Sequence, residues 1–381
     1  MGLPDAQIVI AGGGPAGSMS AGLLARAGFD VLLLESGGPD NDVLCSGLLN
    51  PEAQAALGLT PPAHVLREPL APLLQYHDRD NCIRLEYDPR YLNTSRPAFD
   101  AWLREEAQAQ GVRIHYETRA KRISHGERGI SLATSRGELS CRVLLDCTGW
   151  RALSRKQSTR RPAPHVHAFQ GTITADLPPG SMWAIFDSAL TDYYAWIVPK
   201  GGQRFLLGAG YLQASDVTRD QAENPWGKLQ RMLDYLAALG YAVGLEDAKP
   251  LGSPITTPTD MRQLWWGERG VIPVGEASGM VSPSSGDGIS FCLQGGISIA
   301  QTLTQFRSEL TGPVSDDLHR RMLRHYLSGM APALSELRFN ILKARTAADP
   351  LWRNAAVRLL PLFLRRPIAR LDWAGSGIQQ A

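Results

Sequence analysis

The amino-acid sequence predicts a mixed α/β protein with one parallel sheet, one antiparallel sheet and a helical C-terminal tail. Three observations support this prediction. Residues 7–27 and residues 270–307 each read as strand, glycine-rich turn and helix, and residues 151–270 alternate strand-like runs with turns. We therefore expect one discontinuous domain from residues 1–150 with 271–310, a second domain from residues 151–270, and a helical region over residues 311–381.

Composition narrows the class of protein. The chain has 381 residues, of which 44% are hydrophobic, enough for a sizeable core. Lysine and arginine number 39 against 37 aspartate and glutamate, so charge gives no reason to expect a nucleic-acid partner. We find neither a signal segment nor a stretch of roughly 18 apolar residues that would span a membrane. The cysteines form no C-x-x-C pair, which predicts free thiols, no bound metal and a cytoplasmic protein; they are Cys45, Cys82, Cys141, Cys147 and Cys292.

The N-terminal segment carries a phosphate-binding pattern. A buried strand over residues 7–11 leads into G-x-G-x-x-G at residues 12–17, and a small-residue helix follows. The glycines permit a tight turn, approach of a pyrophosphate and close helix packing, while the helix N-terminus attracts negative charge. A second strand, residues 30–34, ends at Glu35, which is suited to holding ribose hydroxyls. The predicted dinucleotide contacts are Gly12, Gly14, Pro15, Ala16, Gly17, Glu35 and Ser36.

The second strand–turn–helix segment separates FAD from NAD. A strand over residues 270–274 precedes Gly-Glu-Ala-Ser-Gly at 275–279, Ser-Pro-Ser-Ser-Gly-Asp-Gly-Ile at 282–289 and a helix. This segment resembles the flavin-ribityl segment of FAD oxidoreductases that share a fold with aromatic hydroxylases. The resemblance implies a Rossmann-like FAD-binding domain, with Glu276 on the ribityl chain and the amides of Gly286, Gly288 and Ile289 beside the flavin pyrimidine. Taken alone, the segment is also compatible with a Ser/Gly-rich surface loop.

Two charged residues outside these segments have alternative interpretations. Arg96 heads a predicted helix and resembles a family arginine that lies near the flavin, but a solvated arginine would look the same in the sequence. Asp146 follows a strand over residues 143–145, and we expect it to shape a turn rather than to contact the cofactor.

Three further motifs are Cys-Ser-Gly-Leu at 45–48, Tyr-Ala-Trp-Ile-Val-Pro at 194–199 with Gly-Ala-Gly at 208–210, and Ser-Gly-Asp-Gly-Ile at 285–289. They resemble motifs of the geranylgeranyl reductase family, which reduces isolated carbon–carbon double bonds of isoprenoid chains, and the resemblance spans most of the first 310 residues. Val198 replaces the family's phenylalanine, and relatives usually carry Glu in place of Asp287. The resemblance implies a small apolar, prenyl-type substrate and an antiparallel β-sheet substrate domain over the flavin ring. Cys45, Tyr194 and Trp196 are the catalytic candidates, with Cys45 also beside the flavin.

Each of these motifs also has a purely structural interpretation. Tyr194, Trp196 and Val198 alternate along a strand, so they would form either a substrate wall or one face of a core. Cys45 would be a small buried hydrophobe.

Other reactions use the same type of fold. A single-component hydroxylase of an aromatic or natural-product substrate is the main alternative, although Gly279 and Ile289 stand where such enzymes typically carry His and Asn. A flavin-dependent halogenase is third: its W-x-W-x-I-P signature is similar to residues 194–199, but it needs a lysine from the N-terminal domain, and this chain has none before Lys121. A non-enzymatic flavin sensor or scaffold is the remaining alternative.

The C-terminal tail is helical by pattern, with an apolar stripe formed by Leu318, Met322, Leu323, Tyr326, Leu327 and Met330. Residues 351–381 carry one acid and five arginines, which are Arg353, Arg358, Arg365, Arg366 and Arg370. Such a segment would either lie on an anionic membrane surface as a peripheral contact or dock as a helix with a solvated arginine face. The electron donor is undecided between NAD(P)H and a ferredoxin-like protein.

Overall fold

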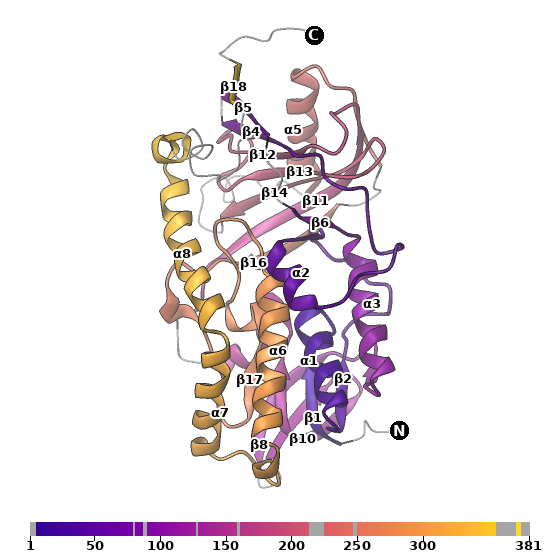
Figure 1. Cartoon of the computed structure of the whole chain (residues 1–381), viewed down its shortest axis with the longest axis vertical. Helices are drawn as coiled ribbons and strands as arrows, with labels where there is room; N and C mark the ends of the chain where they lie inside the picture. Colours follow the sequence, from indigo (N-terminus) through magenta and orange to yellow (C-terminus); the bar gives the residue numbers. More distant parts are fainter. Residues whose placement is uncertain are drawn as a thin grey trace.

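The computed structural model describes residues 5–78, 81–86, 90–126, 129–157, 161–212, 225–246, 250–355 and 371–374. Figure 1 shows an elongated molecule in which two sheets lie at opposite ends, helices α7 and α8 run along one side, and α6 lies between them and α1. The predicted α/β fold, with a Rossmann-like unit, a second sheet and C-terminal helices, is confirmed.

The first sheet has the strand order β7-β2-β1-β10-β9-β8, with β17 paired to β10. Its strands are β1 (Ala6–Ala11), β2 (Val31–Leu34), β7 (Arg113–His115), β8 (Ala120–Gly126), β9 (Gly129–Thr134), β10 (Gly137–Asp146) and β17 (Val271–Pro273). β1 pairs in parallel with β2 and β10, and β17 pairs in parallel with β10. β1 and β2 are apolar and buried almost throughout because both faces of the sheet are covered.

Three helices pack on this sheet around the largest apolar core, and they are α1 (Pro15–Arg26), α3 (Arg96–Ala109) and α6 (Ile289–Gln305). The short helix α2 (Pro51–Leu57) belongs to a separate apolar cluster with α3 and the start of α6. α1 packs against both α3 and α6, and α2 packs against α6. Ile8 and Ile10 point toward α1 and α6, while Val9 points to the opposite face, against β9 and β10. Short 3-10 helices connect these elements: η1 (Gly149–Arg151), η2 (Leu153–Gln157), η3 (Met261–Gln263), η4 (Gly275–Ser278) and η5 (Arg307–Glu309).

The second sheet has the order β15-β11-β14-β13-β12-β4-β5-β18, with β16 paired to β11. Its strands are β4 (Leu73–Asp78), β5 (Asn81–Glu86), β11 (His165–Ala175), β12 (Met182–Ile185), β13 (Ala195–Gly201), β14 (Arg204–Leu212), β15 (Val243–Leu245), β16 (Leu251–Thr256) and β18 (Leu371–Ala374). One face packs on α5 (Pro225–Ala238), where Ile197, Phe205 and Leu207 meet Met232 and Leu236.

This sheet corrects two expectations. Residues 73–86 were assigned to the first domain, but β4 and β5 extend the second sheet. The sheet is also not wholly antiparallel, because β12 and β4 run in parallel. β4 and β5 pair with each other in antiparallel fashion, and β4 joins the second sheet through β12. A two-stranded sheet of β3 (Leu48–Leu49) and β6 (Leu92–Asn93) lies near α2.

The C-terminal region contains α7 (Asp316–Gly329) and α8 (Ala331–Ala348). The predicted apolar stripe is confirmed: its members are buried in, or packed against, the core around α1 and α6. Of the tail arginines only Arg353 is described, and its guanidinium is buried against Asp78, so a solvated position is wrong for this residue. Arg358, Arg365, Arg366 and Arg370 lie outside the described residues. Among the helices of the described part of the chain, none combines the length and apolarity needed to cross a bilayer.

Candidate functional site

The glycine-rich turn at residues 12–17 leaves room for a phosphate at one position. Gly12 has φ +106°, and a Cβ there would collide with the Cys147 carbonyl. A Cβ on Gly17 would collide with the Gly12 carbonyl, which explains the close packing of α1 on β1. A Cβ on Gly14, in contrast, would meet no atom within 4 Å. Gly14 is the N-cap of α1 and supplies no capping side chain, and Pro15 and Ala16 begin the helix. The open space therefore faces a helix N-terminus suited to an anion.

Glu35 lies beside this turn, at the end of β2. Its carboxylate accepts hydrogen bonds from Gly13 N at 2.8 Å and Gly37 N at 2.9 Å, so its position is defined by the backbone. Ser36 is exposed and donates to the same carboxylate. The space at Gly14 and the acid at the strand end together fit the diphosphate and ribose of a dinucleotide.

The turn at residues 282–289 forms the N-terminus of α6. Gly286 has φ +67°, and its amide donates to Ser282 O at 2.8 Å. Gly288 is the N-cap, and the amide of Ile289 donates to Asp287 Oδ1 at 3.1 Å. Two of the expected cofactor-facing amides, those of Gly286 and Ile289, are thus engaged within the turn. The expected contact of Gly286, Gly288 and Ile289 with the flavin pyrimidine stays a prediction.

Asp287 also ties this turn to another element. Its Oδ2 accepts a hydrogen bond from Asn50 Nδ2 at 2.7 Å, and Asn50 Oδ1 caps α2. Burial raises the pKa of Asp287. The aspartate that replaces the family's glutamate therefore joins the start of α6 to the start of α2.

Glu276 is a buried carboxylate at the carboxyl end of the first sheet. Its Oε1 accepts a hydrogen bond from Thr256 N at 2.9 Å, and burial raises its pKa. The residue lines a cavity of about 270 Å³ together with Trp150 and His165. Its contact with the ribityl chain stays a prediction. Asp146 accepts bonds from the amides of Thr148 and Ser154, so the prediction that it shapes the turn is confirmed.

Arg96 and Cys45 lie together, on elements far apart in the sequence. Arg96 begins α3 and forms a bidentate ion pair with Asp100, at 2.7 and 3.2 Å, with a side chain only 13% exposed. Burial alone would lower the pKa of Arg96, but Asp100 and then Cys45 raise it above its ordinary value. The solvated interpretation of Arg96 is therefore wrong. Cys45 is half-buried, and its Sγ accepts from Gly47 N at 3.4 Å.

Tyr194 and Trp196 lie on the face of the second sheet that is opposite its packed core. Their ring centroids are 5.6 Å apart, whereas the alternate residues Ala195 and Ile197 point into the core with α5. A Cβ on Gly208 would collide with the Trp196 indole, so this glycine of the Gly-Ala-Gly motif lets the indole lie flat on β14. β13 begins only at Ala195, but Gly210 N still donates to Tyr194 O at 3.0 Å.

Tyr194 contacts the turn before α6 directly, and Trp196 is linked through Gln170 to the turn that contains Cys45. The Tyr194 hydroxyl donates to Ser285 O at 2.5 Å, in the turn before α6. Trp196 Nε1 donates to Gln170 Oε1 at 3.4 Å, and Gln170 Nε2 donates to Cys45 O at 3.4 Å. The structure thus brings the motifs at 45–48, 194–199 and 285–289 to one place.

Lys200 is a residue of this site that the sequence analysis did not single out. Its ammonium donates to Ser46 O, next to Cys45, at 2.5 Å. The signal was present in the sequence, because alternation along the strand puts Lys200 on the same face as Trp196 and Val198. Residues 1–120 contain no lysine, but Lys200 reaches the turn that contains Cys45 from β13.

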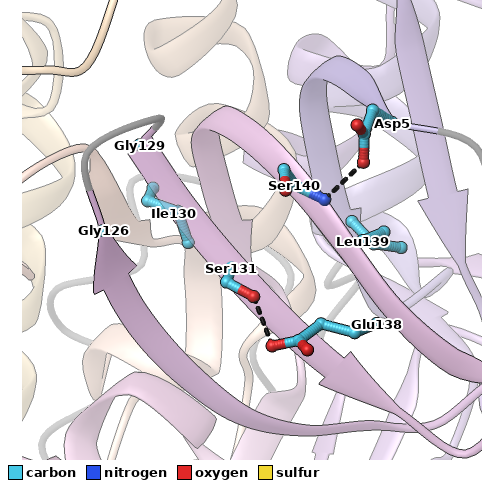
Figure 2. Close-up of a pocket in the computed structure, with 8 residues that line it drawn as sticks. All are labelled: Asp5, Gly126, Gly129, Ile130, Ser131, Glu138, Leu139 and Ser140. Atoms are coloured by element: carbon cyan, nitrogen blue, oxygen red, sulfur yellow. Dashed lines mark hydrogen bonds between the residues drawn. The ribbon is translucent and has the colours of Figure 1, made fainter.

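A cavity of about 640 Å³ lies away from these residues, on strands β8 to β10 (Figure 2). Asp5, directly before β1, accepts the Ser140 amide at 2.7 Å at its margin. Since the glycine turn follows the other end of β1, this cavity lies at the opposite end of the sheet and contains none of the predicted site residues.

Comparison with known proteins agrees with this geometry. A family model described as FAD-dependent oxidoreductase matches residues 87–280, just over half of the chain. Protein CbrA of Shigella sonnei is 27% identical over 300 residues, which cover 75% of this chain and 81% of that protein.

Two solved structures have similar folds. A geranylgeranyl bacteriochlorophyll reductase-like protein of Thermoplasma acidophilum has a TM-score of 0.73 at 16% identity, covering 94% of this chain and 100% of that chain. A variant of the halogenase PltM in complex with FAD has a TM-score of 0.70 at 15% identity, covering 93% of this chain and 79% of that chain. With the phosphate turn, the ribose acid and the turn before α6 in place, the cofactor is FAD, and the chain belongs to the FAD-dependent oxidoreductase family.

Proposed function

We propose that this protein reduces carbon–carbon double bonds of an apolar, prenyl-type substrate. The observation that carries the proposal is the position of Tyr194 and Trp196, whose rings lie opposite the packed core. Tyr194 bonds directly to the turn that holds Asp287, and Trp196 is linked to Cys45 O through Gln170. An apolar chain would lie against these rings, next to the flavin. Electrons would enter from NAD(P)H or a ferredoxin-like protein.

The residues around Cys45 would supply the proton that alkene reduction needs. FAD, held by the phosphate turn, Glu35 and the turn before α6, would supply hydride chemistry at this site. The Cys45 thiol would give its proton to one alkene carbon, and the thiolate would regain a proton from solvent. The Arg96 side chain lies beside Cys45. Burial raises the pKa of Tyr194, and its O–H is bonded to Ser285 O, so Tyr194 would orient the substrate rather than act as the acid.

Product analysis tests this proposal against the rival reactions. FAD-loaded protein would be incubated anaerobically with a chemical reductant and a prenyl alcohol or prenyl diphosphate. We expect a product that has gained two hydrogens, formed without oxygen. A parallel incubation would contain isotopically labelled oxygen and halide. A product that forms only there and carries the labelled oxygen would make the protein a hydroxylase, and halide incorporation would make it a halogenase; either result would overturn the proposal.

Replacing Trp196 separates a substrate wall from a core position. The Trp196→Ala variant should bind substrate less tightly by roughly 1–3 kcal/mol, the usual contribution of one large apolar contact. FAD content and melting temperature should change little, because the indole is only half-buried and lies outside the core on α5. Equilibrium binding of the prenyl ligand and thermal unfolding measure the two effects.

Trp183 provides a matched control on the neighbouring strand. It pairs with Ile197, is 1% exposed and packs in the core on the opposite face. The Trp183→Ala variant should lose roughly 3–5 kcal/mol of stability, as buried aromatic truncations usually do. If Trp196→Ala behaved like Trp183→Ala, with unchanged substrate affinity, Trp196 would be a core residue and not a substrate wall.

A further inference from the structure

Lys200 has an unusual position for a lysine. The side chain leaves β13 near its end, where the pairing with β14 is irregular, and is largely buried. Its ammonium has three acceptors: Ser46 O at 2.5 Å, Asn93 Oδ1 at 2.7 Å and Thr94 O at 3.0 Å. An ammonium carries three N–H donors, so each donor has one oxygen. Lys200 thereby joins β13 to the turn at residues 45–47 and to β6.

The same turn is held by neutral hydrogen bonds at its other carbonyls. Thr94 donates to Gly47 O through its amide at 2.9 Å and its hydroxyl at 2.6 Å. Gln170 donates to Cys45 O at 3.4 Å. The carbonyl between them, Ser46 O, is the one that receives a charged donor. Since charge-assisted bonds are about twice as strong as neutral ones, Lys200 makes the strongest of these contacts.

We propose that Lys200 is a positioning residue that holds the turn at residues 45–47, and with it the Cys45 thiol, against the flavin. The inference rests on the proposed function for the location of Cys45 beside the flavin. Lys200 is not the acid of the reaction, because its three protons are donated to protein oxygens. A lysine that faces a reacting centre would have at least one N–H free for it, whereas the three N–H groups of Lys200 are bonded to Ser46 O, Asn93 Oδ1 and Thr94 O.

The charge of Lys200 gives the proposal a pH dependence. Burial lowers the pKa of Lys200 to about 8; the titratable and charged groups that face it are Cys45, which acts in the opposite direction, and Arg67, which lowers the pKa further. Above this pH the neutral amine has two N–H groups for three oxygens, so one contact is lost. The turn should therefore loosen as the pH rises through about 8.

The test compares Lys200→Met with Lys121→Met, which removes an exposed lysine on β8. Hydrogen exchange, followed by mass spectrometry on peptides that contain Ser46, Gly47 and Thr94, reports the position of the turn without using activity. We expect exchange at these amides to be at least tenfold faster in Lys200→Met, and FAD to bind about tenfold more weakly. Lys121→Met should match the native protein in both measurements. The affinity of the native protein for FAD should also weaken as the pH rises above about 8, because Lys200 loses its charge there. The affinity of Lys200→Met for FAD should not show this weakening.

Chemical rescue distinguishes a missing ammonium from a general loss of structure. In Lys200→Ala, n-propylammonium should restore slow exchange and FAD affinity, whereas tetramethylammonium, which cannot donate a hydrogen bond, should not. Unchanged exchange in Lys200→Met, or equal effects of the two cations, would overturn the proposal. Faster exchange with unchanged FAD affinity would also overturn it, since the turn would then be held by Lys200 but not against the flavin. That result would contradict only the role of Lys200. It would leave open whether the protein reduces carbon–carbon double bonds, because product analysis tests that separately.

Discussion

The Gly14→Val variant should fold normally and fail to bind FAD. A Cβ at Gly14 meets no protein atom, so the branched side chain would fill the open space at the N-terminus of α1 where the pyrophosphate belongs. Gly14 has φ −76°, which any residue adopts, so the change causes no backbone strain. Valine is a poor N-cap, which adds a cost of about 1 kcal/mol at most. We expect the Kd for FAD to rise at least a hundredfold, about 2.7 kcal/mol.

Gly126→Val is the matched control for this variant. Gly126 ends β8, a Cβ there also meets no atom within 4 Å, and the residue lies at the opposite end of the sheet from the phosphate turn. Flavin fluorescence titration of the FAD-free proteins gives the affinities, and thermal unfolding of the same samples gives the stabilities. Native FAD affinity in Gly14→Val would show that the pyrophosphate does not bind at this turn. A lower melting temperature in Gly14→Val alone would show that the glycine is structural.

Local patterns in the sequence were sufficient for the cofactor half of the site. The residues of the phosphate turn are consecutive, and the close contact that requires Gly17 lies within this strand–turn–helix unit, whereas the contact that requires Gly12 is made by the distant Cys147 carbonyl. The aromatic motif was predictable in part, since alternation puts Tyr194 and Trp196 on one face. Which face they share depends on α5 and β14, and no local pattern contains that information.

The elements that were not predicted depend on distant pairings. β4 pairs with β12, which lies about a hundred residues further along the chain, and a hairpin carries no signal for such a partner. The basic tail was interpreted as a membrane contact or a solvated helix because Arg353 and Asp78 are 275 residues apart. Arg353, like Arg96, reads as a surface arginine until the carboxylate that it meets is known.

The Arg353→Met variant should lose roughly 3–5 kcal/mol of stability, as expected when one partner of a buried ion pair is removed. Arg353 Nε lies 2.9 Å from Asp78 Oδ2 and 3.1 Å from the Tyr76 hydroxyl, and its guanidinium stacks over the Phe186 ring at 4.8 Å. Asp78 is 1% exposed, and its Oδ1 has no hydrogen-bond partner within the described residues. Without Arg353, the Asp78 carboxylate would be a buried charge that has lost its cation partner among the described residues.

A double variant and a variant of an exposed ion pair show whether the stability loss in Arg353→Met comes from the buried ion pair. Asp78→Asn combined with Arg353→Met removes both charges, so its loss of stability should be smaller than the sum of the two single losses. Arg113→Met removes the cation of an exposed pair, with Arg113 41% and Asp30 55% exposed, where about 0–1 kcal/mol is usual. Denaturant unfolding measures all four variants. Additive losses, or an Arg353→Met loss no larger than that of Arg113→Met, would show that the C-terminal segment is not held by this pair. The ring centroids of Phe186 and Tyr194 are 5.8 Å apart. Loss of the ion pair beside Phe186 should therefore also weaken binding of the proposed substrate against the Tyr194 and Trp196 rings.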